Sequence, residues 1–275
     1  MSRDDREHIR ALYDEAGDAE WLRLERTPSG RVSHVIHQRF LACYVKSGDH
    51  VLEVGAGPGR FTFDLAALGA RVDVTDISQV QLDLHRIHLE GSQAENAVLS
   101  RTILDICDTS RYLDGSFDAV IAYGGPLSYA FEQAEEALTG LFRITRPGGV
   151  VVASVMSLLG TWRYFLRGTV EDTKEWGENA NDLVLETGDL RHFGAPHVCQ
   201  MFRSHEIADM VSRSGATLLA MSASNWASLA DEDVLLELEV DPDKWTRFLN
   251  HEVSACSESG VLDGGTHLLF AARRG

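Results

Sequence analysis

The residues with the clearest chemical purpose are three glycines, Gly55, Gly57 and Gly59, that follow a short apolar run. A second apolar run begins at residue 71 and ends in an acid, Asp76. Glycine is required where the backbone turns sharply and a ligand approaches closely, because a Cβ would collide there. A carboxylate at the tip of the next strand can accept hydrogen bonds from both hydroxyls of a ribose. The pattern therefore predicts strand, tight turn, helix and strand, which is the start of a nucleotide-binding βαβ unit.

The glycine loop departs from the pattern that binds dinucleotides. In the G-x-G-x-x-G fingerprint, the loop amides and the helix N-terminus hold a pyrophosphate. Here the third glycine comes one residue early, and Pro58 removes a backbone N–H. Glu53, inside the first strand, would repel a diphosphate but suits a ligand with an ammonium group. These departures favour S-adenosylmethionine, which has a ribose, a sulfonium and an amino-acid tail but no phosphate.

At these residues the chain resembles the Rossmann-like, class I S-adenosylmethionine-dependent methyltransferases of the small-molecule type, whose loop reads E/D-x-G-x-G-x-G. Three later segments match the family in the same order, at residues 104–106, 116–128 and 141–149. The resemblance covers about residues 10 to 275. It implies the cofactor and the fold, but it does not identify the substrate.

The resemblance implies an α/β three-layer sandwich around a doubly wound, seven-stranded, mostly parallel sheet with an antiparallel last strand. We expect N-terminal helices as a cap over residues 1–48, and a methyltransferase domain over 49–275 with an inserted lid at about 157–200. The first of the seven expected strands starts at Val51. The other six are expected over residues 71–75, 98–104, 117–123, 150–155, 216–222 and 266–272. A helix is expected over 132–146, stopped by the Pro-Gly-Gly at 147–149.

The same resemblance assigns roles around the cofactor. Glu53, Gly55 and Gly57 would meet its amino-acid end, and Asp76 its ribose. Ile77 and Ile106 would enclose the adenine or belong to the plain core, and the backbone near Tyr123 would face the methionine part. The complete predicted set is Tyr13, Glu53, Gly55, Ala56, Gly57, Asp76, Ile77, Gln81, Asp105, Ile106, Tyr123 and Gly124.

A general base is needed if the methyl acceptor is a hydroxyl or an acidic carbon, and much less for an amine. Histidine suits this task near neutral pH. His192 and His197, in the lid, are the predicted catalytic residues, with Tyr129 in reserve. The predicted substrate contacts are Trp21, Ser128, Tyr129, Trp162 and Phe193, although for Trp21 a role as a core anchor is favoured.

Other charged and histidine side chains are read as structural. His34 and His37 share a helix face and are interpreted as helix-surface histidines rather than a metal pair, and no metal site is predicted. Arg60 and Asp64 are interpreted as helix-surface charges. The same structural or exposed role is expected for His205, His251 and His267.

Composition limits the class of protein. A net charge of −17 argues against a nucleic-acid substrate, which would need a basic track. The sequence has neither an apolar run of about 18 residues nor a secretory N-terminus, so we expect a cytoplasmic protein without a membrane span. The four scattered cysteines are expected to be free thiols.

Two acidic stretches, 169–190 and 231–243, are interpreted as solvated surface or as a rim that attracts an amine substrate. A homodimer is considered possible.

The predicted function is methyl transfer to an O, N or C atom of a small molecule. The aromatic residues of 158–200 suggest an aromatic or heteroaromatic acceptor. Two alternatives remain at this point, an aminopropyl transferase for polyamines and a non-catalytic cofactor-binding pseudo-methyltransferase.

Overall fold

A seven-stranded sheet forms the centre of the protein, with the strand order β3-β2-β1-β4-β5-β7-β6. The computed structural model describes residues 3–194 and 197–275. Five neighbouring strands are parallel, and β7 is antiparallel to both β5 and β6. The strands are β1 (His50–Val54), β2 (Arg71–Asp76), β3 (Val98–Ile103), β4 (Phe117–Ala122), β5 (Thr145–Met156), β6 (Thr217–Ala223) and β7 (His267–Arg273). The predicted fold class and the antiparallel last strand are confirmed.

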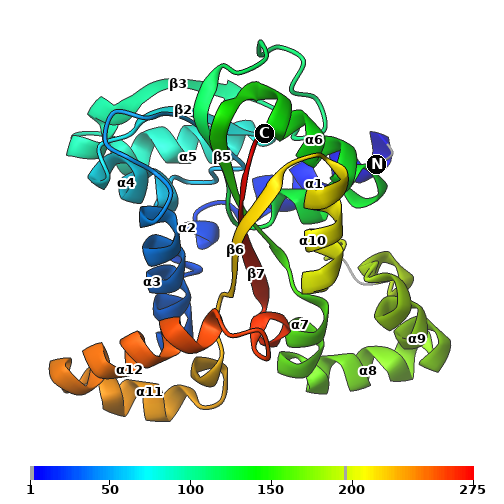
Figure 1. Cartoon of the computed structure of the whole chain (residues 1–275). Coiled ribbons are helices and arrows are strands. Elements are labelled where there is room, and N and C mark those ends of the chain that lie inside the picture. Colours follow the sequence, from blue (N-terminus) through cyan, green and yellow to red (C-terminus); the bar gives the residue numbers. More distant parts are fainter. Residues whose placement is uncertain (1–2, 195–196) are drawn as a thin grey trace.

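Helices cover both faces of this sheet (Figure 1). The α-helices are α1 (Arg3–Ala16), α2 (Ala19–Leu22), α3 (Pro28–Ala42), α4 (Arg60–Ala67), α5 (Gln79–Leu89), α6 (Ala134–Ile144), α7 (Leu158–Tyr164), α8 (Leu166–Trp176), α9 (Glu178–Thr187), α10 (Ser204–Arg213), α11 (Glu232–Glu239) and α12 (Pro242–Cys256). Short 3₁₀ turns are η1 (Gln93–Ala97), η2 (Pro126–Tyr129), η3 (Phe131–Gln133), η4 (Leu190–His192), η5 (Ala227–Leu229) and η6 (Leu262–Gly264).

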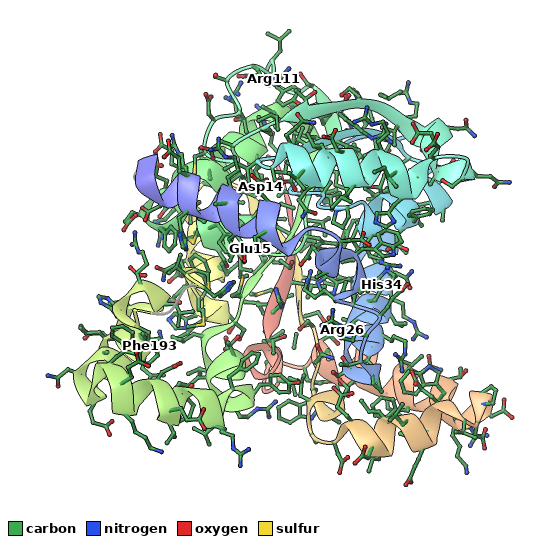
Figure 2. All side chains as sticks on the ribbon, turned by 180° about the vertical axis from the view of Figure 1, so that it is seen from behind. Asp14, Glu15, Arg26, His34, Arg111 and Phe193 are labelled. Atoms are coloured by element: carbon green, nitrogen blue, oxygen red, sulfur yellow. The ribbon has the colours of Figure 1, made fainter. Side chains whose placement is uncertain are left out.

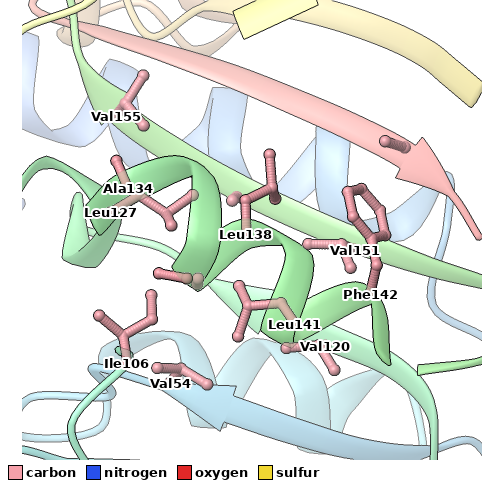
Figure 3. Close-up of a cluster of buried hydrophobic side chains, with 14 of the residues drawn as sticks. Val54, Ile106, Val120, Leu127, Ala134, Leu138, Leu141, Phe142, Val151 and Val155 are labelled. Carbon is pink, nitrogen blue, oxygen red and sulfur yellow. The ribbon is translucent and has the colours of Figure 1, made fainter. Parts of the chain in front are cut away.

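Two hydrophobic clusters hold these layers together. On one face, α6 and α10 pack onto the strands, and Figure 3 shows Leu138 and Leu141 of α6 against Val120 and Val151. On the other face, α3, α4 and α12 contribute buried side chains such as Val32, Leu65 and Leu249. The central strands read as nearly continuous apolar runs because both of their faces are covered.

The segment after β5 forms an arm of three helices, α7 to α9, joined to the core by a third cluster. This cluster includes Leu158, Val184 and Phe193, and it also contains Ile9 of α1. In Figure 1 the α8–α9 pair and the α11–α12 pair lie on opposite sides below the sheet. The lid is therefore helical, which its irregular apolar spacing did not predict.

Two local expectations need correction. The helix expected over 132–146 ends at Ile144, and Thr145 already starts β5. The Pro-Gly-Gly at 147–149 lies within that strand, beside a register shift between Phe117 and Ala119 of β4. A proline fits there because a bulge leaves it no ladder hydrogen bond to donate.

The acidic stretch 231–243 also contains structure that its charge concealed. Asp231 accepts hydrogen bonds from the first amides of α11, and Asp241 does the same for α12. Side-chain oxygens of this kind satisfy helix N–H groups that would otherwise lack partners. Some of the excess acids therefore cap helices.

Two further features bear on the sequence expectations. All four cysteines are free. Across residues 3–194 and 197–275, none of the helices combines the length and apolar character that a membrane crossing requires.

Gly160 and Gly168 provide a matched test of the packing of the arm. A Cβ on Gly160, in α7, would lie 1.8 Å from the carbonyl oxygen of Gly265, whereas nothing lies within 4 Å of a Cβ on Gly168, in α8. We expect Gly160→Ala to lower the free energy of unfolding by about 1–3 kcal/mol or more. Gly168→Ala should instead raise it by about 0.5–1 kcal/mol. Urea denaturation measures both, and equal effects would contradict the tight contact between α7 and Gly265.

Candidate active site

The glycine loop between β1 and α4 has the strained backbone that only glycine adopts easily. Gly55 and Gly57 have φ values of 69° and 54°. A Cβ on Gly55 would lie 2.5 Å from the ring of Pro126, so this turn packs directly against the loop after β4. The N–H of Gly57 donates to the Asp76 carboxylate over 2.9 Å. The carboxyl ends of β1, β2 and β4 are thereby joined around one cavity, which we call the cofactor cavity.

Ten of the twelve predicted cofactor residues line the cofactor cavity. Glu53 and Gln81 do not line it. The lining members are Tyr13, Gly55, Ala56, Gly57, Asp76, Ile77, Asp105, Ile106, Tyr123 and Gly124.

Asp76 sits at the tip of β2 with spare capacity to accept hydrogen bonds. Burial raises the pKa of Asp76 to about 6, opposed by hydrogen bonds from the backbone N–H groups of Ser78 and Gly57. The group is therefore mainly ionised at neutral pH. One backbone N–H reaches each carboxylate oxygen, so lone pairs remain for ligand hydroxyls. This arrangement suits a ribose.

Glu53 has a different partner from the one predicted. Its side chain is 2% exposed, and it accepts a 2.6 Å hydrogen bond from the Thr62 hydroxyl of α4. Burial raises the pKa of Glu53 to about 8. A buried, mainly neutral carboxyl that does not reach the cavity cannot offer its charge to a ligand ammonium.

The Glu53 carboxyl ends a buried chain of hydrogen bonds. Arg101 Nε donates to His85 Nδ1 over 2.9 Å, so the proton of the neutral ring is on Nε2. His85 Nε2 lies 2.9 Å from the Thr62 hydroxyl, which in turn donates to Glu53. Burial, followed by the charge of Arg101, lowers the pKa of His85 to about 3. This series of hydrogen bonds connects the strand before the glycine loop to the neighbouring helices.

Gln81 leaves one buried atom without a partner. Its Nε2 donates to the carbonyl oxygens of Tyr13 and Gly17, at 2.8 and 3.2 Å, which ties α5 to the N-terminal segment. Its Oε1 is buried and has no hydrogen-bond partner among the described residues. A Cβ on Gly57 would lie 3.8 Å from this oxygen. Gln81 therefore supports the N-terminal segment from behind the glycine loop, and its side chain does not reach the cofactor cavity.

An ion pair in the N-terminal segment was missed by the sequence analysis. Arg23 Nε and Glu20 Oε1 are 2.6 Å apart, and both residues line the cofactor cavity. Glu20 lies 3.8 Å from a Cβ placed on Gly57, and Arg23 lies 3.7 Å from one placed on Gly124. The pair presents both signs of charge near the two glycines, as a zwitterionic amino-acid group would require. Many residues of the N-terminal segment are charged, so nothing in the sequence set Glu20 and Arg23 apart from the others as cavity residues.

Trp21 anchors the N-terminal segment. Its ring stacks on His88 with 4.1 Å between ring centroids. The guanidinium of Arg60, on α4, lies 3.7 Å from the centroid of the Trp21 ring. The interpretation of Arg60 as a helix-surface charge was wrong, since its side chain is only 15% exposed and also pairs with Glu25. Trp21 does not line the cofactor cavity, nor does it line the second cavity described below.

A second cavity of about 790 Å³ opens from the first, and we call it the acceptor cavity. Both cavities share the residues Tyr13, Glu20, Arg23, Leu24, Gly124 and Tyr129. Of the residues predicted to contact substrate or act as a base, four line the acceptor cavity, namely Tyr129, Trp162, Phe193 and His197. Figure 2 shows α1, marked by Asp14 and Glu15, crossing the molecule with Phe193 below it on one side and His34 on the other.

Two other predicted residues do not reach the acceptor cavity. Ser128 is fully buried, and its hydroxyl accepts a 2.9 Å hydrogen bond from the N–H of Met156. His192 lines a separate hollow together with Arg191. Among the predicted bases, the geometry therefore brings His197 but not His192 to the place where an acceptor could bind.

His37 is not the helix-surface histidine that its spacing suggested. It is 3% exposed, donates from Nδ1 to the carbonyl of Ser33 over 2.8 Å, and packs edge-on against Tyr123. Burial lowers the pKa of His37 to about 3. His34 also has a partner, because its Nε2 lies 2.9 Å from the carboxylate of Asp64. Among the described residues, no group of three His, Cys, Asp or Glu side chains could hold a metal ion.

His267 is a second residue that the sequence analysis missed. As the first residue of antiparallel β7, it pairs with Met156 at the end of β5 and lines the acceptor cavity. Burial chiefly, with the charges of Arg23, His37 and His197, lowers the pKa of His267 well below its usual value. Two other residues that line this cavity, Tyr13 and Tyr129, have their hydroxyls hydrogen-bonded over 2.8 Å. The acceptor cavity thus holds neutral groups that can exchange hydrogen bonds.

The matched family agrees with this geometry. Residues 51–149 match a family described as a methyltransferase domain. This match and the sheet order agree with the resemblance to the class I, Rossmann-like methyltransferases over residues 51–149.

One sequence relative is a ubiquinone biosynthesis O-methyltransferase of Alkalilimnicola ehrlichii, 27% identical over 162 residues that cover 51% of this chain and 62% of the relative. The chain spans less than two thirds of the length of each curated relative it matches.

Solved structures share the fold at low sequence identity. A geranyl diphosphate C-methyltransferase from Streptomyces coelicolor, in complex with S-adenosyl-L-homocysteine, has a TM-score of 0.53 and 16% identity over 87% of this chain and 78% of its own. The [4+2]-cyclase SpnF also has a TM-score of 0.53, with 14% identity over 89% and 80%. The fold alone therefore does not decide the reaction.

The raised pKa of Glu53 gives a pH-dependent prediction. The folded protein keeps a proton on this carboxyl up to about pH 8, whereas an unfolded chain loses it near pH 4.3. Stability therefore falls as pH rises through this window, because the native state binds more protons. Glu53→Gln cannot ionise, so its free energy of unfolding relative to wild type should improve by roughly 1–3 kcal/mol between pH 5 and pH 8. Urea denaturation at both values measures the change, and Glu258→Gln, at an exposed position, should show none.

Proposed function

We propose that this protein is an S-adenosylmethionine-dependent methyltransferase acting on an O, N or C atom of a small molecule. The observation that carries the proposal is the meeting of two cavities at Gly124, one built around the glycine loop and Asp76, the other lined by apolar and proton-exchanging side chains. A methyl donor in the first cavity would face an acceptor in the second. The family match over residues 51–149 supports the same reading.

The residues of the cofactor cavity fit the parts of S-adenosylmethionine. Asp76 would accept from the ribose hydroxyls, Ile77 and Ile106 would enclose the adenine, and the Glu20–Arg23 pair would bind the amino-acid end. Asp105 lies 2.8 Å from Arg6 of α1, so the N-terminal helix is tied to the adenine edge of the cavity. Bound there, the cofactor supplies an activated methyl group on a sulfonium.

The contribution of the chain is alignment, exclusion of water and proton transfer. Methyl transfer from a sulfonium is an in-line displacement, so the acceptor atom must be held in one position. Tyr13 and Tyr129, from α1 and η2, are hydrogen-bonded to each other and line both cavities. His197 is the group that would accept a proton from a hydroxyl or an acidic carbon, and His267, with its strongly lowered pKa, would serve as a neutral hydrogen-bond partner.

Aminopropyl transfer to a polyamine has weaker support than methyl transfer. A polyamine needs a groove lined by several acids, and of the acidic stretch 169–190 only Asp172 is among the described residues that line the acceptor cavity. A non-catalytic role is countered by the intact glycine loop and Asp76. A homodimer and a cytoplasmic location remain predictions.

Removal of the Asp76 carboxylate tests the cofactor assignment. Asp76→Ala loses charge-assisted hydrogen bonds to the ribose, each worth about 1.5–3 kcal/mol, so the Kd for S-adenosylhomocysteine should rise by about 100-fold or more. Asp73→Ala is the matched control on the same strand, because Asp73 bonds to Ser100 and His50 outside the cavity. Isothermal titration calorimetry measures both. Unchanged affinity in Asp76→Ala would refute the assignment.

Arg23 is tested by comparing two ligands. Arg23→Gln removes the cation that would bind the ligand carboxylate, so affinity for S-adenosylhomocysteine should fall about tenfold. Affinity for 5′-methylthioadenosine, which lacks the amino-acid end, should stay the same. Arg26→Gln, at an exposed position of the same segment, is the control. An equal loss for both ligands would mean that Arg23 only supports the fold.

A further inference from the structure

The acceptor cavity is larger and more apolar than a small polar acceptor requires. The arm contributes Trp162, Tyr164 and Phe165 to its wall, and Leu229 of η5 contributes too. Its volume of about 790 Å³ lies in the range that encloses a drug-sized molecule. Since the acceptor cavity shares six lining residues with the cofactor cavity, its occupant is the methyl acceptor of the proposed function, on which this inference rests.

One face of α8 forms part of the cavity wall. Gly168, Thr169 and Asp172 line the cavity at the spacing of one helix face, and Phe165, directly before the helix, lines it too. Val170, on another face of the same helix, is 48% exposed and does not line the cavity. The four steps from Gly168 to Asp172 correspond to about 6 Å along the helix, and Phe165 extends this wall by about one further turn. A tail of the bound molecule would lie along this face of α8.

The end of the cavity near Gly124 is polar, and among the described residues that line it there no carboxylate is left unpaired. Tyr13 and Tyr129 present hydroxyls, and His267 presents a ring whose pKa is lowered. Glu20 is already paired with Arg23. A hydroxyl head group could exchange hydrogen bonds here, whereas a permanent cation would lose its hydration beside the like charge of Arg23, which lies 3.7 Å from a Cβ placed on Gly124.

We propose that the acceptor is an elongated, largely apolar molecule with one uncharged hydroxyl head group. The head lies at the Gly124 end of the acceptor cavity, beside Tyr129 and His267, and the apolar tail follows the lining face of α8.

Binding of a homologous series tests this substrate class without knowledge of the natural acceptor. The full chain is first saturated with S-adenosylhomocysteine, and then titrated with phenol, 4-ethylphenol, 4-butylphenol and 4-hexylphenol. Each buried CH₂ contributes about 0.8 kcal/mol, so the Kd should fall about three- to fourfold per carbon. Hexyltrimethylammonium, with the same tail, should bind at least about tenfold more weakly than 4-hexylphenol.

The outcomes separate the two proposals. Failure of S-adenosylhomocysteine to bind in the first step would overturn the proposed function. Binding of that ligand followed by a Kd that stays flat beyond ethyl, or by non-saturable binding of the alkylphenols, would overturn the elongated apolar substrate. A cation that binds as well as the phenol would overturn the uncharged head group.

Two substitutions on α8 locate the tail. Gly168→Phe adds a ring where a Cβ would have nothing within 4 Å, so the fold can accommodate it while the cavity narrows. We expect it to weaken 4-hexylphenol binding about tenfold or more, with phenol and S-adenosylhomocysteine unaffected. Val170→Phe, on the exposed face of the same helix, is the control and should leave all three unchanged. Intact affinity for 4-hexylphenol in a folded Gly168→Phe protein would contradict this position of the tail.

Discussion

The hydrogen bond from the Gly57 N–H to the Asp76 carboxylate is the constraint on which the site depends. It joins the turn after β1 to the tip of β2, and the left-handed backbone of Gly57 makes that approach possible. On the other side, Gly55 packs against Pro126 after β4. Three strand ends are thus held at one edge of the sheet, where an open α/β fold binds its ligands. The cofactor cavity exists because these contacts fix its floor.

Sequence reasoning was strongest where chemistry and periodicity agree. The glycine loop and Asp76 were predicted because each has a local signature, and the antiparallel last strand was predicted because the resemblance to the methyltransferase family implies it. Glu53 was assigned to the ligand because it precedes the loop, but side chains alternate along a strand. Val54 lines the cofactor cavity, so Glu53 faces the opposite side of the sheet, toward Thr62. Alternation along β1 could have revealed this difference.

Other parts of the site depend on tertiary structure. None of the α8 residues is buried, so the helix lacks the apolar stripe that a sequence pattern needs. The Glu20–Arg23 pair lies at the cofactor cavity because the N-terminal segment packs across the glycine loop, which the sequence pattern does not show. His267, in contrast, was within reach of prediction. An antiparallel strand begins where its parallel neighbours end, so the first residue of β7 had to lie at the ligand-binding edge.

The N-terminal segment has a consequence that follows from its position between two cavities. Tyr13, Glu20 and Arg23 form part of the wall of both, and Gln81 and Asp105 hold this segment in place from below. A wall shared by two ligands makes their binding free energies interdependent. If the cofactor orders this segment, it must increase the affinity for the acceptor, and thermodynamic reciprocity requires the acceptor to strengthen cofactor binding by the same factor. The segment thus acts as a cooperative element as well as a cover.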